Sequence, residues 1–156
     1  MRTSIMRASV FLALAACGTT GDDDPYAPVD CSKVTNVDTF TVGLEKMGKS
    51  GMLDFKLMSI TPAPPTRGDN DWTVQVASMT SGVVGAPLDG ASLNVSPYMP
   101  AHMHLSGVTT VVSAAADPGT YKLSPVNMAM NGVWEVTIRA TAASVTDSAV
   151  YSFCIP

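Results

Sequence analysis

The chain has 156 residues, of which 46% are hydrophobic and 14% charged, and its formal net charge is −4 at pH 7. This length is enough for one hydrophobic core but not for two ordinary domains. The excess of acidic groups argues against a nucleic-acid-binding surface, which needs clustered lysine and arginine.

Residues 1–16 have the pattern of an export signal. Arg2 and Arg7 precede a short apolar run that ends in small residues directly before Cys17. The run is about half of the ~20 residues that span a bilayer, so it predicts a cleaved segment rather than a transmembrane helix. Residues 14–17, Leu-Ala-Ala-Cys, resemble the bacterial lipobox. This resemblance implies acylation of Cys17, and several acyl chains anchor a protein stably in a membrane.

The alternative is a soluble secreted protein in which Cys17 has no special role. Gly18, which follows the cysteine, resembles the residue found in lipoproteins that are sorted to an outer membrane. Loss of the signal would leave seven basic and thirteen acidic side chains, a formal charge of −6. Residues 17–30 contain almost nothing that packs, so they predict a hydrated acidic tether. A calcium site at residues 22–24, all aspartate, is the alternative for this stretch.

Residues 31–156 predict a single all-β domain. Several runs alternate apolar and polar residues and are rich in β-branched and aromatic side chains, with Gly, Pro and Asp between them. The predicted strands, in chain order, are 39–45, 53–60, 72–78, 91–96, 108–113, 120–123, 134–139 and 149–154. The proline-rich stretch 61–70 predicts a solvated connection. Seven or eight short strands without a helical period predict an immunoglobulin-like antiparallel β-sandwich rather than an up-and-down barrel.

Two cysteines remain after Cys17. Cys31 lies at the start of the predicted domain and Cys154 lies two residues from its end. An even pair in an oxidising compartment predicts a disulfide, here one that joins the two ends of the domain. Closing so long a loop is worth nearly ~5 kcal/mol in the chain-entropy account.

Both histidines fall within residues 99–104, Met-Pro-Ala-His-Met-His. Imidazole binds copper, zinc or nickel, and the soft thioether favours Cu(I), so this mixture indicates copper. In a regular strand His102 and His104 would face one side, while Met99 and Met103 would face the other. A combined site therefore requires the segment to bend.

A second methionine pair, Met128 and Met130, precedes the strand predicted at 134–139. These two residues are candidate ligands if their loop lies at the same end of the sandwich as residues 99–104. Methionine is also a flexible core filler, so packing is the alternative for both. The other four methionines of the predicted domain have no histidine nearby and are predicted to pack in the core: Met47, Met52, Met58 and Met79.

The order of motifs over residues 57–140 resembles the YtkA-like family of small exported β-sandwich domains. The matching positions are Met99-Pro100, then Gly119 and Tyr121 of a Gly-x-Tyr motif, and Gly132 and Trp134 of a Gly-x-Trp motif. The resemblance implies a Met- and His-rich element between strands and a link to copper handling. Its glycines permit tight turns and its aromatic residues fill the core. The chain departs from the family pattern at His102, where glycine or methionine is common, and in its added N-terminal region with Cys31.

The leading hypothesis is a lipid-anchored binding domain at a bacterial membrane, facing the periplasm or the cell surface, that holds copper as its cofactor. Its ligands would come from Met99, His102, Met103 and His104, with Met128 and Met130 as second candidates. A metal-free structural module that binds a protein partner is the alternative. An enzyme is disfavoured, because the sequence lacks G-x-S-x-G, H-E-x-x-H and any cysteine left over for nucleophilic work.

Overall fold

The structure is a computed structural model that describes residue 24 and residues 27–156. The predicted signal peptide 1–16, the lipidation site Cys17 and most of the predicted tether 17–30 lie outside the described residues. No helix in the described part of the chain has the length and apolar character needed to cross a bilayer.

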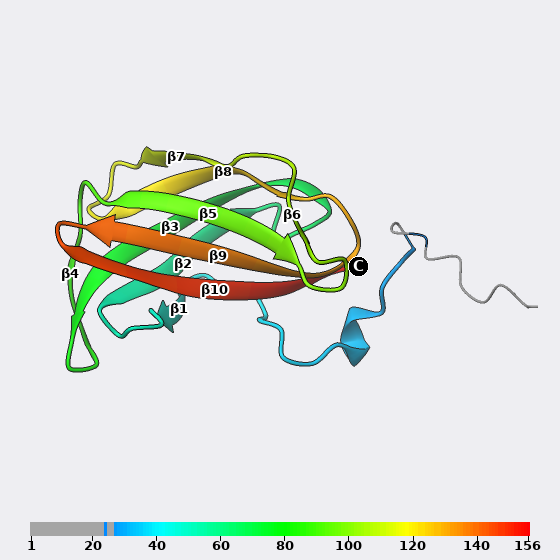
Figure 1. Cartoon of the computed structure of the whole chain (residues 1–156), viewed down its shortest axis with the longest axis horizontal. Coiled ribbons are helices and arrows are strands. Elements are labelled where there is room, and N and C mark those ends of the chain that lie inside the picture. Colours follow the sequence, from blue (N-terminus) through cyan, green and yellow to red (C-terminus); the bar gives the residue numbers. More distant parts are fainter. Residues whose placement is uncertain (1–23, 25–26) are drawn as a thin grey trace, which may run out of the picture.

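The strands form two antiparallel sheets that pack face to face as a sandwich (Figure 1). The six-stranded sheet runs in the order β1 (Leu44–Met47), β2 (Leu53–Thr61), β3 (Gly68–Thr80), β8 (Thr120–Met128) and β7 (Val111–Ala114), with β4 (Val83–Pro87) paired to β3. The four-stranded sheet runs in the order β10 (Val145–Ile155), β9 (Gly132–Ala142), β5 (Ser92–Met99) and β6 (His104–Leu105). The predicted all-β sandwich is confirmed.

The core forms where the inward residues of the two sheets meet. In β9 and β10 buried residues alternate with more exposed ones, as expected for strands with one face on the core. Trp72 of the six-stranded sheet packs edge-on against Tyr151 and Phe153 of the four-stranded sheet, with ring centroids 6.2 and 5.6 Å apart. Full burial of one large apolar side chain contributes about 1.5–3 kcal/mol, so these contacts hold the sheets together.

Strand β3 begins earlier than predicted. The connection expected at 61–70 ends before Gly68, because residues 68–70 already pair with the end of β8. Asn70 is buried, and its side-chain amide donates to the carbonyl oxygens of Thr66 and Gly68 at 2.8 and 3.0 Å. These bonds shape the turn that leads into the strand. Asn70 is therefore a buried polar residue in a stretch for which the sequence predicted a solvated loop.

Other strand limits also differ from the prediction. Strand β1 begins at Leu44 rather than at residue 39, because a turn closed by the Leu44 N–H and the Thr41 carbonyl precedes it. Two short strands, β4 and β6, were not predicted. Every residue of β4 is exposed, so this strand carries no alternation that a sequence pattern could reveal.

The N-terminal segment lies along the free edge of β10. The predicted disulfide is present and joins Cys31, in the 3₁₀ turn η1 (Cys31–Lys33), to Cys154 in β10, with the Cα atoms 5.7 Å apart. Asp38 and Ser152 exchange two hydrogen bonds: the Asp38 N–H donates to the Ser152 carbonyl at 2.6 Å, and the Ser152 N–H donates to the Asp38 carboxylate at 2.7 Å.

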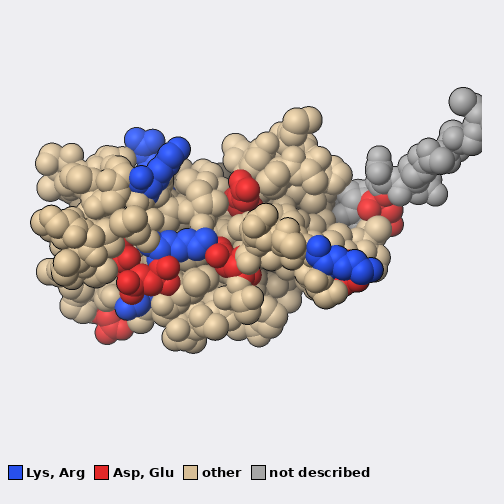
Figure 2. Space-filling view, turned by 90° about the horizontal axis from the view of Figure 1, so that it is seen from below, with Lys and Arg blue, Asp and Glu red and all other residues tan. Residues whose placement is uncertain are grey.

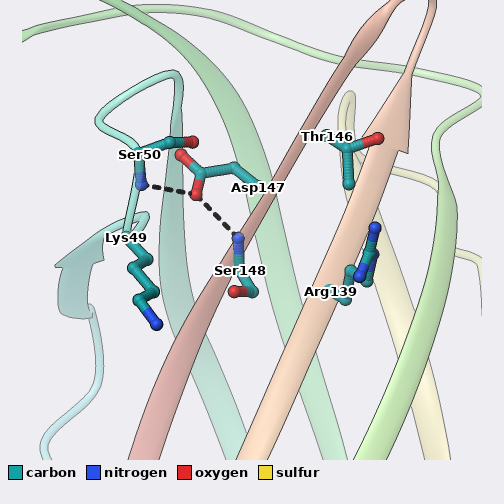
Figure 3. Close-up of a pocket in the computed structure, with 6 residues that line it drawn as sticks. All are labelled: Lys49, Ser50, Arg139, Thr146, Asp147 and Ser148. Carbon is teal, nitrogen blue, oxygen red and sulfur yellow. Dashed lines mark hydrogen bonds between the residues drawn. The ribbon is translucent and has the colours of Figure 1, made fainter.

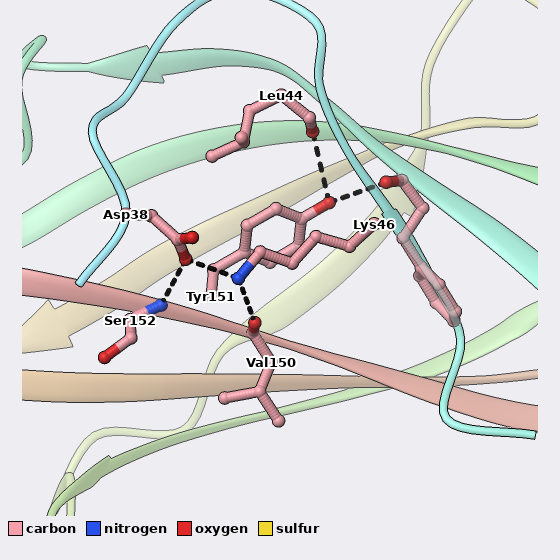
Figure 4. A network of polar contacts seen from close by, with 7 residues as sticks. Asp38, Leu44, Lys46, Val150, Tyr151 and Ser152 are labelled. Carbon is pink, nitrogen blue, oxygen red and sulfur yellow. Dashed lines mark hydrogen bonds and ion pairs between the residues drawn. The ribbon is translucent and has the colours of Figure 1, made fainter. Parts of the chain in front are cut away.

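Lys46 of β1 completes this network (Figure 4). Its Nζ lies 2.6 Å from the Asp38 carboxylate and donates to the carbonyl of Val150 at 2.8 Å. Basic and acidic groups also lie side by side elsewhere on the surface. Figure 2, which views the molecule from below relative to Figure 1, shows that most basic groups on that face lie beside acidic ones. The N-terminal segment thus covers backbone groups of β10 that would otherwise be open to pairing with another chain.

Candidate metal site at one end of the sandwich

The segment with both histidines forms a tight β-hairpin. Met99, the last residue of β5, pairs with His104, the first residue of β6. Between them the His102 N–H donates to the Met99 carbonyl and the Met103 N–H donates to the Pro100 carbonyl, both at 3.3 Å. Met103 adopts a left-handed backbone conformation with φ +54°, which is uncommon for a residue other than glycine. The segment therefore bends, as a combined site would require.

The bend puts Met99 and His104 on the same side of the sheet. Residues directly opposite each other in an antiparallel pair project to one face, and Met99 is 2% exposed, so that face is the core side. The His104 ring packs against the buried ring of Trp134 with centroids 5.9 Å apart and planes at 73°. His104 is thus an inward-facing residue at the end of the sandwich, despite its place on a two-residue edge strand.

The two ring nitrogens of His104 have different surroundings. Nδ1 lies 3.0 Å from the carbonyl oxygen of Leu105. A carbonyl only accepts, so Nδ1 is the donor of this bond, and in the neutral imidazole the lone pair is then on Nε2. Nε2 is buried and has no hydrogen-bond partner among the described residues. Buried polar atoms in folded proteins are nearly always paired, and a carbonyl-bound Nδ1 opposite a free Nε2 is how metal-binding histidines are oriented.

Three methionines lie at the same end of the sandwich as His104, two at strand ends and one in a loop. Met128, the last residue of β8, is fully buried in the core. The hydroxyl of Ser106 donates to Asn127 at 3.4 Å, which ties the segment after β6 to the end of β8. Met130 packs against the core, and its carbonyl accepts the indole N–H of Trp134 at 3.0 Å.

We call the group Met99, His104, Met128, Met130 and Trp134 the histidine end. Four of the six predicted ligands belong to this end of the sandwich. The other two are outside: His102 and Met103 occupy the exposed tip of the hairpin, and Met103 is 81% exposed. The His102 ring is still near, with its centroid 5.9 Å from that of His104.

The donor types at the histidine end bear on which metal ion could bind there. No three side chains of His, Cys, Asp or Glu within residues 24 and 27–156 form a group that could hold a metal ion. The donors available are one imidazole nitrogen and the thioether sulfurs of methionine. Among common metals this donor set favours Cu(I).

The sequence pattern indicates a turn for Gly132 and the core for Trp134, but it does not indicate their part in this site. A Cβ atom at Gly132 would lie 2.7 Å from the terminal methyl carbon of Met99, and the residue has φ +127°. Gly132 therefore leaves room for the Met99 side chain, while Trp134 supports both the imidazole and the Met130 loop. The Gly-x-Trp spacing was the available signal.

The methionines predicted to pack in the core behave differently from one another. Met58 and Met79 are partly buried, but Met47 and Met52 are exposed, so the prediction was wrong for these two. Both lie at the loop between β1 and β2, Met47 as the last residue of β1 and Met52 just before β2. A hydrophobic side chain next to a turn gave no sign of which way it would point.

The opposite end of the sandwich contains a buried carboxylate. Asp147 of β10 accepts hydrogen bonds from the backbone N–H groups of Ser50, Met52, Leu53 and Ser148, at 2.9, 2.9, 3.2 and 2.8 Å. Burial by itself raises the pKa of Asp147, but these N–H groups outweigh it and hold the pKa at about 2. We call Asp147 and the loop over it, residues 48–53, the aspartate end. Its polar atoms are saturated, which indicates a structural role.

Comparison with known proteins identifies one relationship. A family model described as YtkA-like matches residues 48–139, which hold all six predicted ligands. No curated protein and no solved structure matches the chain.

Proposed function

The chain belongs to the YtkA-like family, and on that premise we propose that it is a membrane-anchored extracytoplasmic domain that binds copper at its histidine end. The observation that carries the proposal is the buried Nε2 of His104, which has a free lone pair and no partner in the described part of the chain. A bound metal ion would use that lone pair.

The methionines determine which ion is proposed. Met99 is opposite His104 in the hairpin, and Met128 and Met130 come from the neighbouring strand end and loop. Thioether sulfur is a soft ligand that selects Cu(I) over harder ions of the same size. A site with one imidazole and thioethers would bind and deliver the ion without needing catalysis.

The exposed tip of the hairpin supplies a route to this site. His102 and Met103 carry the same two donor types as the interior, and the His102 ring lies beside that of His104. In the proposed mechanism these side chains capture an ion from solvent and pass it to His104. The imidazole of His102 would also accept Cu(II).

The anchoring part of the proposal rests on the N-terminal sequence. The lipobox-like residues 14–17 and the residues before them support export and acylation at Cys17, with the domain facing the periplasm or the cell surface at an outer membrane. A disulfide between Cys31 and Cys154 is consistent with an oxidising compartment.

The test is titration of the purified, disulfide-bonded protein with Cu(I) in the presence of a competing chelator. The hairpin offers matched controls for each ligand type: His104→Ala against His102→Ala, and Met99→Leu against Met103→Leu. We expect one Cu(I) per chain, a loss of affinity of at least about 100-fold in the two inward variants, and less than about 10-fold in the outward ones. The affinity is also expected to fall in acid, because protons compete for the imidazole nitrogen.

Two results would count against the proposal. Equal affinity in all four variants would show that copper binds elsewhere or only adventitiously. Loss of binding in the His102 and Met103 variants, with the inward variants unchanged, would place the site at the exposed tip and remove the role given to Nε2.

A second candidate function, a protein-interaction module, is favoured by the surface beside the hairpin. Two large apolar side chains are exposed on the hairpin: Met103, just before β6, at 81%, and Leu105, in β6, at 60%. Exposed apolar patches commonly mark interaction sites. The variant Met103→Ser/Leu105→Ser separates the two candidates, because a partner-binding role requires weaker binding to the partner with Cu(I) affinity retained.

A further inference from the structure

A shallow hollow lies on the outer face of the four-stranded sheet, near the aspartate end (Figure 3). Its volume is about 420 Å³, and its lining residues are Lys49, Ser50, Arg139, Thr146, Asp147 and Ser148. The hollow lies near the turn between β9 and β10, whereas the histidine end lies at the other end of these strands, so the two are separate features of the molecule.

Two cations flank one serine in this hollow. Arg139 is directly opposite Ser148 in the β9–β10 ladder, and the Lys49 N–H donates to the Ser148 carbonyl at 2.8 Å. Figure 3 shows the Lys49 and Arg139 side chains on either side of Ser148. Across residues 24 and 27–156, neither cationic group has an ion pair or a hydrogen bond, in contrast to Lys33, Lys46 and Lys56, which are all paired.

The nearby carboxylate does not neutralise these cations. Asp147 also lines the hollow, but its carboxylate is bound by four backbone N–H groups and forms no ion pair with either cation in the described part of the chain. Glu135, on the same outer face of β9, is four residues from Arg139, or about 13 Å along a strand. That separation exceeds the screening length of about 8 Å at physiological salt.

Hydroxyl groups complete the surroundings of the two cations. The Ser148 hydroxyl has no partner in the described part of the chain, and the Thr146 hydroxyl pairs only with that of Thr141, at 2.9 Å. A guanidinium offers a fork of donors to a tetrahedral oxyanion, a lysine adds a point charge, and a serine adds one donor. Such a set in an acidic protein is a local feature rather than part of a general basic surface.

We propose that this hollow binds a phosphate group, either free phosphate or the phosphate of a lipid headgroup, through Arg139, Lys49 and the Ser148 hydroxyl. The guanidinium and the ammonium group neutralise the anion from two sides, and Ser148 orients it between them. The ligand is held on the open face of the sheet, so a phosphate that belongs to a larger molecule or to a membrane surface fits as well as a free one.

The test uses the full chain and two probes. Inorganic phosphate is titrated by NMR, following the amide signals of Lys49, Arg139 and Ser148, and vesicles of phosphatidylcholine with or without phosphatidylglycerol are used in a sedimentation assay. The variant is Lys49→Gln/Arg139→Gln. The control is Lys33→Gln/Lys122→Gln, which removes the same charge from other surfaces. We expect saturable binding that the variant weakens at least about tenfold and the control leaves unchanged.

The outcomes distinguish the two sources. Binding of free phosphate, lost in the variant, identifies a phosphate site; binding only to vesicles that contain phosphatidylglycerol, lost in the variant, identifies a headgroup site. No binding of either probe overturns the proposal. Equal weakening in variant and control also overturns it, because it would reflect net charge alone.

Discussion

The two ends of the sandwich each enclose a polar side chain from the four-stranded sheet, but they treat it in opposite ways. At the aspartate end, four N–H groups saturate the carboxylate of Asp147. At the histidine end, Nε2 of His104 is buried with no partner in the described residues. A saturated buried group stabilises a fold, whereas an unsatisfied one costs free energy. The comparison separates a structural end from an end suited to a ligand.

The largest expected effect is that of Asp147→Asn. The amide keeps one acceptor oxygen but turns an NH₂ group toward N–H groups that need an acceptor, so we expect a loss of about 2–4 kcal/mol in the free energy of unfolding at pH 7. Urea unfolding measures it. The pKa of Asp147 is lowered to about 2, so the stability that its charge supplies is present above pH 4 and is lost as the pH falls toward 2. The gap between wild type and variant should therefore narrow over that range. A gap that does not change with pH would contradict this account.

An effect of opposite sign is expected for Asp54→Asn. Asp54 is 2% exposed, and burial, together with the nearby Glu45 carboxylate, raises its pKa to about 6. A raised carboxyl pKa destabilises the fold where the group is charged, so the variant should be more stable than wild type by about 1–3 kcal/mol at pH 8. The advantage should shrink as the pH falls below 6 and disappear at about pH 3, below the ordinary carboxyl pKa of 3.8, where Asp54 is protonated in both the folded and the unfolded chain. Denaturant unfolding at the two pH values tests this, and a destabilised variant at pH 8 would show that the carboxylate has a partner there.

The smallest effect on stability is expected at the histidine end. His104→Leu removes the unpaired buried Nε2 and loses only one local hydrogen bond, between Nδ1 and the Leu105 carbonyl, so the free energy of unfolding should change by less than about 1 kcal/mol. The same substitution should abolish the proposed Cu(I) binding. A loss of more than about 2 kcal/mol in the metal-free protein would mean that His104 is a structural residue, and would make the two ends alike.

Much of the fold could be predicted from alternation of apolar and polar residues. The strands near Trp72, Trp134 and Phe153 bury one face and carry aromatic residues, so their patterns were clear. The weak points were elements that depend on contacts distant in sequence. Strand β4 is wholly exposed, and β6 has two residues and exists only because it pairs with the end of β5.

The candidate site was predictable in composition but not in geometry. The sequence identified the residue types. A regular strand would put His104 and Met99 on different faces of the sheet, whereas the hairpin puts both on the same face. That reversal comes from the four-residue loop 100–103 and the left-handed Met103. The Asp147 site was not predicted at all, because its four donors come from the backbone and carry no signature in the side-chain sequence.

The N-terminal segment gives the molecule a polarity. The Cys31–Cys154 bridge and a hydrogen bond from Asn131 to the Ala27 carbonyl, at 3.1 Å, tie this segment to the histidine end. Ten residue steps separate Cys17 from Ala27, and a chain extends at most ~3.5 Å per residue, so a lipid at Cys17 would form a leash of about 35 Å. The leash would leave from the histidine end and let the rest of the domain swing outward. A partner that exchanges the proposed ion with the histidine end would then have to work close to the bilayer, within the radius that this leash sets.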